Sequence, residues 1–364
     1  MNKKLLRGLS VSAIALSLFA CGGQSSSSSS SASSVSSSDN SSVVEEKTIK
    51  IDNSKAATKD AGTKIVETKQ ELKERYGMGS DTVQEWNVQT AAFQTYTLGK
   101  TIDEVVSKNY QSHYNPEGTE VVAGCSISAG NFVGSLKTIT DTKTFTTSTA
   151  PIAGAGTIVA GINDENVLTV TVAGVATSAG TDTVLEASIN DYQIPLAIDG
   201  EKVVLDATAK QANEDNLKTH GAGVSQSLSK RELKELYGMT VAGTDEWFVH
   251  ADNFAKYAIG KSASELEGKN YKTHYNTEGT EVVAGCTISC DAFAKAIAEG
   301  GNVLKTTDAP TAADATEYSL KFGSYVEVTK DLQLEVSVGS VVLNSESKIV
   351  SAYFDVLQVP FVIE

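Results

Sequence analysis

Two short segments of this chain place glycine, cysteine and hydroxyl side chains in the same order. Each follows a pair of valines and precedes a predicted helix. Glycine lets a ligand approach the backbone closely, and the amides at a helix N-terminus suit a phosphate. The segments therefore predict two phosphate-binding sites. The predicted binding residues are Gly124, Ser126 and Ser128 in the first segment and Gly285, Thr287 and Ser289 in the second.

The two segments belong to a long internal repeat. Residues 113–127 and 274–288 are identical at thirteen of fifteen positions, at a constant offset of 161 residues. The same offset, without a gap, aligns the Tyr-Gly-Met and Glu-Trp sequences that precede them. Because repeats of this length mark the building units of a fold, the sequence predicts two modules. We place repeat 1 at residues 43–203 and repeat 2 at residues 204–364.

Each repeat begins with segments that are typical of short helices. Thr68 with Glu71, and Ser229 with Glu232, have the spacing of a capping box, which satisfies the first backbone amides of a helix. Ser128 and Ser289 are predicted to be N-caps of a later helix. The further helices predicted from helical periodicity cover 82–98 and 245–259, short segments after Thr101 and Ser262, and 129–138 and 290–299.

The second half of each repeat has the alternation and the β-branched residues of strands. The predicted strands are 167–172, 184–189, 193–198, 318–322, 332–338 and 349–363. Pro195 and Pro360 lie in similar segments and suit edge strands or bulges.

The fold class predicted is α+β, with two tandem repeats that each have a short-helix half and a small antiparallel-sheet half. Two arrangements remain open. Either each repeat packs its own helices on its own strands, or the C-terminal strands pack against the first helices.

The N-terminus has the pattern of a lipoprotein signal. Basic residues precede an apolar stretch at 9–19, which is shorter than the roughly 20 residues that span a bilayer. The stretch ends in Ala-Cys, which resembles a bacterial lipobox and implies lipidation of Cys21. We expect the signal peptide at residues 1–20 to be removed, and the serine-rich residues 21–42 to be a flexible tether. The predicted location is the outer face of the bacterial cytoplasmic membrane, at the cell surface, with Cys21 as the lipid anchor.

The charge of the chain excludes one class of partner. The formal net charge is −15, from 45 acidic and 30 basic residues, and binding to nucleic acid phosphates requires clustered lysine and arginine. The sequence holds no Ser-His-Asp arrangement, P-loop or His-Glu-x-x-His motif, so hydrolase and nucleotide-hydrolysing functions have no support. No catalytic residue is predicted.

Three cysteines remain beyond Cys21: Cys125, Cys286 and Cys290. An odd number excludes a complete disulfide framework. The spacing of Cys286 and Cys290 is not typical of zinc ligands, so no metal site is predicted. We expect Cys125 and Cys286, which are equivalent in the two repeats, to be small buried apolar residues.

Other conspicuous side chains have plain structural interpretations. Trp86 and Trp247 are expected in the core, and Ser126 and Thr287 have the alternative role of helping to cap a helix. The histidines of the repeat, His113 and His274, are expected to be at the surface or hydrogen-bonded, and its glutamates to be solvated: Glu117, Glu120, Glu278 and Glu281.

The segment from Glu281 to Ser289 resembles the motif of the FMN-binding domain family of bacterial surface electron-transfer proteins. That family carries Asp-x-x-Ser/Thr-Gly-Ala-Thr-x-Thr/Ser, with FMN esterified through its phosphate to the last residue of Gly-Ala-Thr. The resemblance implies covalent FMN at Thr287, with Ser126 as its counterpart, and a small set of strands. This chain departs from the motif at Glu281 in place of Asp, at Ala284 in place of the first hydroxyl, and at Cys286 in place of Ala.

A broader resemblance covers nearly the whole mature chain. The Lys-Glu-Leu-Tyr-Gly-Met, Glu-Trp, Ile-Gly-Lys and Thr-Ile-Ser sequences resemble tandem-repeat lipoproteins of Firmicutes, which look like degenerate relatives of FMN-binding domains. Two functions follow. In the first, an anchored electron carrier holds FMN at one or both repeats and passes electrons to a redox partner outside the membrane. In the second, a non-catalytic surface lipoprotein binds a small ligand or a protein partner between the repeats.

Overall fold

The computed structural model describes most of the chain after the predicted tether. The described residues are 47–51, 57–59, 63–65, 67–110, 119–148, 151–162, 166–206, 228–237, 239, 244–276, 279–306, 317–328, 334–359 and 361–364. The predicted signal peptide, Cys21 and the tether lie outside these residues, as do His113, Glu117, Glu278 and Pro360. Within the described ranges, no helix is both long and apolar enough to cross a membrane.

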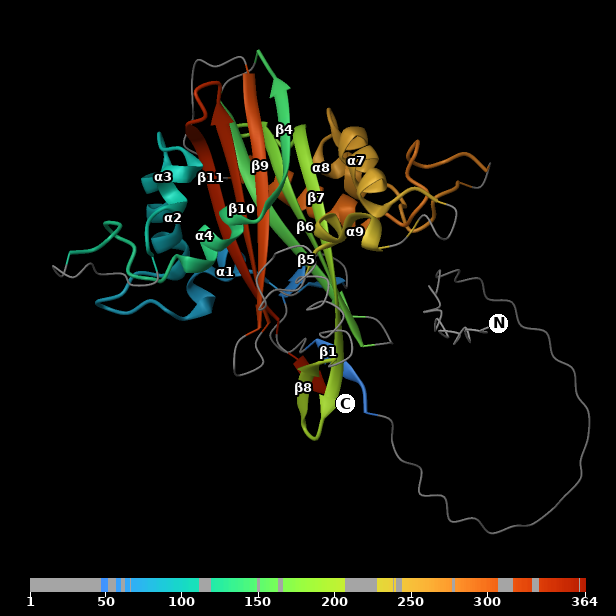
Figure 1. The fold of residues 1–364 in the computed structure, drawn as a ribbon, viewed down its shortest axis with the longest axis horizontal. Helices are drawn as coiled ribbons and strands as arrows, with labels where there is room; N and C mark the ends of the chain where they lie inside the picture. The colour runs from blue at the N-terminus through green and yellow to red at the C-terminus, as the bar shows by residue number, and fades with distance from the viewer. Residues whose placement is uncertain are drawn as a thin grey trace, which may run out of the picture. The chain divides into compact units, whose positions relative to one another are not determined.

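Two four-stranded antiparallel sheets form the centre of the fold (Figure 1). In sheet order, the first contains β5 (Ile152–Ile162), β6 (Val167–Ser178), β7 (Val184–Asp199) and β8 (Lys202–Leu205). The second contains β11 (Ile349–Val359), β10 (Leu334–Asn344), β9 (Glu317–Val328) and β4 (Ile139–Thr146). The predicted α+β class with antiparallel strands is confirmed.

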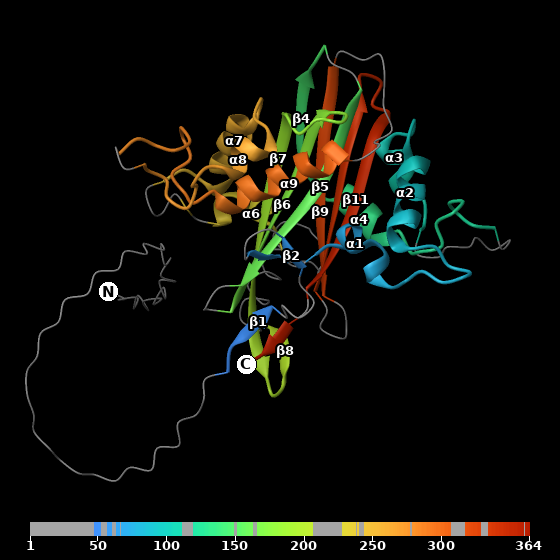
Figure 2. The same ribbon diagram turned by 180° about the vertical axis from the view of Figure 1, so that it is seen from behind.

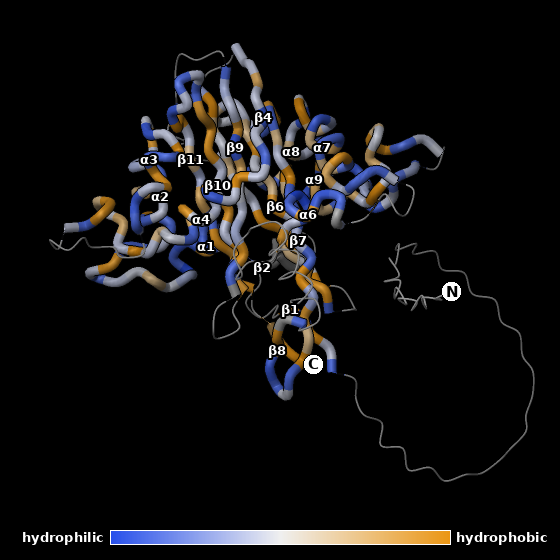
Figure 3. The backbone as a smooth tube through the Cα atoms, viewed as in Figure 1, coloured by the Kyte–Doolittle hydropathy of each residue, from blue (hydrophilic) through white to orange (hydrophobic). Residues whose placement is uncertain are grey.

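An apolar core lies between the two sheets. Buried residues of β6 and β7 meet buried residues of β9, β10 and β11, among them Val170, Ile194, Phe322, Val338 and Leu357. Figure 3 shows hydrophobic stretches along these central strands. Gly174 on β6 permits close approach of the sheets, because a Cβ there would come within 2.7 Å of the Phe322 side chain.

Helices cover the outer face of each sheet (Figures 1 and 2). On the sheet of β9–β11 lie α1 (Lys69–Leu72), the 3₁₀ helix η2 (Lys73–Tyr76), α2 (Trp86–Thr97), α3 (Ile102–Val106) and α4 (Gly130–Lys137). On the sheet of β5–β7 lie α6 (Lys230–Leu233), η3 (Lys234–Tyr237), α7 (Trp247–Ala258), α8 (Ala263–Glu267) and α9 (Asp291–Thr306).

The helices cross between the repeats. The helices before residue 138 pack on strands after residue 317, and the helices after residue 230 pack on strands between residues 152 and 199. Equivalent loops make the same backbone contact in both halves: Gly99 donates to the Ile349 carbonyl and Gly260 donates to the Val184 carbonyl, each at 2.8 Å. Of the two arrangements that the sequence left open, the C-terminal strands therefore pack against the first helices.

Two smaller sheets complete the fold. β1 (Ile49–Ile51) pairs antiparallel with β12 (Phe361–Ile363), so the first and last described strands lie side by side. A short hairpin joins β2 (Ala57–Lys59) and β3 (Thr63–Ile65).

Local signals at the helix starts are mostly confirmed. Capping boxes begin α1, α3, α6 and α8, with Thr68, Thr101, Ser229 and Ser262 as the capping residues. The predicted start of α2 at residue 82 is wrong, because the helix begins at Trp86. The Ser80 hydroxyl accepts the amide of Val83 at 3.2 Å, which holds this segment in a turn rather than a helix.

Three other predictions need correction. Residues 184–189 and 193–198 form one strand, β7, and Pro195 lies where β7 leaves β6 and begins to pair with β8. α9 continues through Gly300 to Thr306 rather than ending at 299. Gly300 is therefore not a helix end but a point of close packing on β6, where a Cβ would come within 2.6 Å of Val175. The predicted strand 349–363 is divided between β11 and β12, which belong to different sheets, and β1 to β5 and β8 lie where no strand was predicted.

Buried polar contacts join the first helix of each repeat, α1 or α6, to the sheet on which it packs. The Gln70 amide donates to Oδ1 of Asp355 on β11 at 3.1 Å, and the Arg231 amide donates to Oδ1 of Asn190 on β7 at 3.3 Å. Lys230 Nζ also lies 2.5 Å from Asp191 Oδ2, with both side chains buried. Burial alone would lower the pKa of Lys230, but the attraction of Asp191 outweighs it and raises that pKa.

We expect Lys230→Met to lower the free energy of unfolding by about 3–5 kcal/mol, because Asp191 would remain buried without its partner. Lys69→Met is the matched control. Lys69 is the equivalent residue, and its Nζ lies 3.9 Å from Glu335 in a less buried pair, so the loss should be smaller. Urea unfolding measures both variants, and equal losses would contradict the prediction.

Asp355→Asn is expected to change the pH dependence of stability. Burial raises the pKa of Asp355 to about 7, so the folded state binds more protons than the unfolded state, and stability falls as pH rises from about 4 to about 7. The variant, which copies Asn190, should remove this slope and gain about 1–4 kcal/mol above pH 7. Urea unfolding of both proteins at pH 5 and pH 8 tests this, and a difference that does not grow with pH would contradict it.

Candidate functional site

The glycine of each motif sits in a tight turn. Gly124 and Gly285 have φ values of +76° and +70°, which favour glycine. Their amides donate to the carboxylates of Glu120 and Glu281, at 2.9 and 2.8 Å. Both glutamates are partly exposed, in line with the prediction that they are solvated, and each carboxylate in addition closes the turn. It follows that neither glycine amide is free to bind a phosphate.

Ser128 and Ser289 do not cap helices as predicted. The N-cap of α4 is Ala129, and α9 begins at Asp291, so both serines lie too early in the chain. Each hydroxyl donates to the carbonyl of a preceding tyrosine, Tyr110 or Tyr271, at 3.4 Å. The Ser128 hydroxyl also accepts the amide of Gly130, the first residue of α4, at 3.5 Å. Both serines are exposed, and the bonds to the tyrosines tie the turn to the segment before it.

The second motif meets α7 through a chain of hydrogen bonds. Thr287 Oγ1 lies 3.1 Å from Thr244 Oγ1, which lies 3.1 Å from Nε2 of the buried His250. On the other side of the ring, Nδ1 lies 3.3 Å from the Gly285 carbonyl oxygen. Nδ1 also lies 3.4 Å from the Thr287 amide nitrogen, which donates to it when Nδ1 carries no proton. In the other tautomer, Nδ1 donates to the Gly285 carbonyl, and Nε2 can then accept a proton from the two hydroxyl groups.

The pKa of His250 is shifted by its surroundings. Burial lowers its pKa, but hydrogen bonding to Cys286 and to the Gly285 carbonyl outweighs burial, so the pKa is raised. The Gly285 carbonyl also accepts from Asn253 Nδ2 at 2.6 Å. The imidazole is therefore contacted by the turn at Nδ1 and by Thr244, which precedes α7, at Nε2.

The first motif has the same turn but different partners. The Ser126 amide and hydroxyl both donate to Oε1 of Gln89, at 2.7 and 2.8 Å. Gln89 stands at the position of His250, and its amide does not titrate near neutral pH. Across the whole site, Val83, Gln89, Ala92 and Ala129 of repeat 1 replace Thr244, His250, Asn253 and Cys290 of repeat 2.

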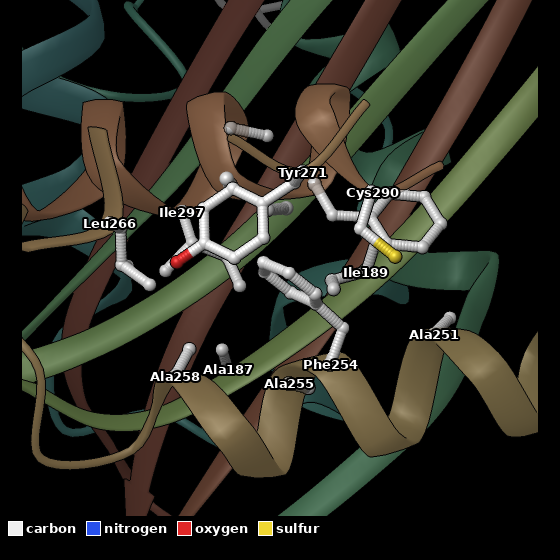
Figure 4. Packing of buried hydrophobic residues seen from close by; sticks show 14 of the residues in the cluster. Ala187, Ile189, Ala251, Phe254, Ala255, Ala258, Leu266, Tyr271, Cys290 and Ile297 are labelled. Atoms are coloured by element: carbon white, nitrogen blue, oxygen red, sulfur yellow. The ribbon is translucent and has the colours of Figure 1, made fainter. Parts of the chain in front are cut away.

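The three cysteines of the repeats are buried, with no disulfide between them. Burial raises the pKa of Cys125 to about 11, which fits the predicted apolar role. Cys286 is buried as predicted, but its Sγ lies 2.6 Å from Sγ of Cys290. Figure 4 shows Cys290 beside the side chains of Phe254 and Tyr271 under α9.

Other residues singled out by the sequence have structural roles. Trp86 and Trp247 lie in the core as predicted, each edge-on to a phenylalanine, Phe132 or Phe293. His274 is partly buried next to Tyr275, and its carbonyl accepts the Val282 amide. In the described part of the chain, no group of three or more His, Cys, Asp or Glu side chains is placed to hold a metal ion.

A polar cavity of about 530 Å³ lies between α4 of repeat 1 and β9 of repeat 2. Ser128 of the first motif is at its edge, and Lys137 and Glu327 give it charges of both signs. Its other lining residues are Gly130, Asn131, Gly134, Thr138 and Tyr325.

No protein-family model, curated protein or solved structure matches the chain. The function of the site is therefore argued from its own geometry and from the motif resemblance. Sequence reasoning placed Thr287 in the site but missed His250 and Thr244. Both residues could have been found by aligning the two repeats, because Thr244 and His250 stand at positions where the repeats differ.

Gly285→Ala is expected to lower the free energy of unfolding by about 1–2 kcal/mol, because the left-handed conformation disfavours a side chain. The added Cβ would also lie 2.6 Å from Asn253 Nδ2. Gly161→Ala is the control, since a Cβ there meets no atom within 4 Å and its φ is not positive. A urea midpoint for Gly285→Ala as high as that of the control would contradict the expected strain.

Proposed function

We propose that this chain is a lipid-anchored extracytoplasmic protein that carries FMN on Thr287 and exchanges electrons with a redox partner. The observation that carries the proposal is the hydrogen-bonded chain from Thr287 through Thr244 to His250. The hydrogen-bonded chain begins at Thr287, within residues 281–289, the segment that resembles the FMN attachment motif, and its other two members come from residues outside that segment. The lipobox-like Cys21 and the serine-rich segment after it support the location.

The residues at the second motif fit an ester bond better than a backbone phosphate cradle. The Gly285 amide is used by Glu281 and the Cys286 amide by the Val283 carbonyl. The Thr287 hydroxyl, in contrast, is only partly buried and has a path for its proton. The covalent bond at Thr287 would therefore hold the group, with exposed Ser289 next to it.

Thr287 and His250 divide the work of attachment. Oγ1 of Thr287 would attack the flavin-side phosphorus of a flavin dinucleotide presented by a flavin transferase, so that the new ester bond replaces the pyrophosphate bond and a nucleoside monophosphate leaves. In the tautomer with a proton on Nδ1, the hydroxyl proton would pass through the Thr244 hydroxyl to Nε2 of His250. The Gly285 carbonyl contacts the imidazole ring, and Asn253 donates to the same carbonyl, so these bonds fix the position of the turn relative to the ring. FMN, when bound, supplies the ring system that accepts and releases electrons.

The first motif supports a single attachment site. Ser126 donates to an amide oxygen of Gln89, which cannot take its proton at neutral pH. The proposal therefore places one FMN on the protein, in repeat 2.

A second function is binding of a small polar ligand without electron transfer. The cavity between α4 and β9 favours it, since Lys137 and Glu327 would each pair with an opposite charge on a ligand. In that case the protein would be a non-catalytic surface lipoprotein.

Thr287→Ala is expected to abolish covalent FMN, because it removes the only proposed ester oxygen. Ser126→Ala is the matched control and should keep one FMN per chain. The measurement is intact mass and in-gel flavin fluorescence of the denatured protein, produced together with a flavin transferase. Flavin retained in Thr287→Ala would overturn the assignment. Unmodified wild-type protein, with the transferase active on a known substrate, would favour ligand binding.

A further inference from the structure

Repeat 2 contains two thiols in direct contact. Cys286 lies in the turn of the motif and Cys290 immediately before α9, and their Sγ atoms are 2.6 Å apart. Sulfur atoms that only pack against each other lie farther apart than this. Both side chains are buried, with 1% and 3% of their surface exposed.

The surroundings separate the two thiols chemically. The hydrogen bond with Cys290, together with a smaller contribution from His250, lowers the pKa of Cys286 to about 6 against the effect of burial. The same contact, together with burial, raises the pKa of Cys290. The pair is therefore one thiolate and one thiol near neutral pH, which is the arrangement found at reactive cysteines. The other titratable groups that face this cluster are Asp245 and Tyr271.

The first repeat shows that the fold does not need this pair. The turn around Cys125 has the same positive φ at its glycine and the same bond to a glutamate. There, however, Ala129 stands in place of Cys290 and Gln89 in place of His250. Both partners of Cys286 are thus present only in repeat 2, although the turn forms without them.

We propose that Cys286 and Cys290 form a thiol–disulfide site that is oxidised by small-molecule disulfides. The Cys286 thiolate attacks one sulfur of the disulfide RSSR, forms a mixed disulfide and releases RS⁻. The Cys290 sulfur then attacks Sγ of Cys286 and releases the second RS⁻. The two cysteines lose two electrons and two protons, and RSSR is reduced to two RSH.

Access to the site runs through the turn. Ala284, Gly285 and Ser289 are exposed around the buried sulfurs, so a small disulfide reaches Cys286 when the turn opens locally. Once formed, the Cys286–Cys290 bond is covered again and closes a short loop that contains Thr287. The proposal does not rest on FMN attachment, because the bond forms between Cys286 and Cys290 whether or not Thr287 carries a group.

The test uses the full chain with Cys21→Ser, which leaves three cysteines. The protein is equilibrated with mixtures of reduced and oxidised glutathione at pH 7, quenched with acid, alkylated under denaturing conditions and weighed. We expect the number of alkylated cysteines to fall from three to one as oxidised glutathione increases, with the loss of two hydrogens and peptide mapping to Cys286 and Cys290. Three alkylated cysteines at every ratio, or a bond to Cys125, would overturn the proposal.

Two variants copy repeat 1. Cys290→Ala should form no internal disulfide, so that Cys286 either stays free or carries glutathione. His250→Gln should slow the oxidation about twofold at pH 7 and about fivefold at pH 6, because a rise of about one unit in the pKa of Cys286 lowers its thiolate fraction from about 0.9 to about 0.5 at pH 7 and from about 0.5 to about 0.1 at pH 6. The rate should also reach half its maximum at a higher pH than in wild type. An unchanged pH profile would remove His250 from the site.

Discussion

Burial of each helical layer on the sheet of the other repeat is the constraint on which the rest of the structure depends. Phe93 and Phe132 pack against Phe354 of β11, with ring centroids 5.4 and 5.2 Å apart. In the other half, Phe254 and Ile297 share a core with Ile189 of β7. Because the apolar face of each set of helices is covered only by strands from elsewhere in the chain, the two halves stabilise each other and form one body around a shared inter-sheet core.

This shared scaffold separates backbone geometry from chemistry. The same glycine turn, closed by the same kind of glutamate contact, occurs on both sides of the molecule. The side chains around the turn differ. Gln89 and Ala129 in one copy stand where His250 and Cys290 stand in the other, so a serine–glutamine contact is replaced by a cluster of hydroxyl, imidazole and thiol groups. A duplicated module can in this way keep one copy for structure while the other gains a reactive site.

The sequence predicted what depends on neighbouring residues. A capping box depends on only four consecutive residues, and each of the four predicted from the sequence begins a helix. β5 was not predicted because its alanines and glycines have little strand propensity. The structure explains these small residues, since the facing sheet packs closely against β5. Periodicity could not show the crossing, since either sheet offers the helices an apolar face. Within the site, the motif identified Thr287, whereas His250 was recognisable only by comparing the repeats position by position.

The crossed arrangement also bears on how the chain reaches its final state. The hydrogen bond between Gln70 and Asp355 joins residues 285 positions apart, so at 5–20 residues per second its partner emerges from the ribosome about 15–60 s later. For that time, the first helices have no sheet on which to fold, and contacts of such long range also slow the search for the native topology. The first helices therefore reach their final packing only when β9, β10 and β11 are present, whereas β5 to β8 form a sheet without those strands.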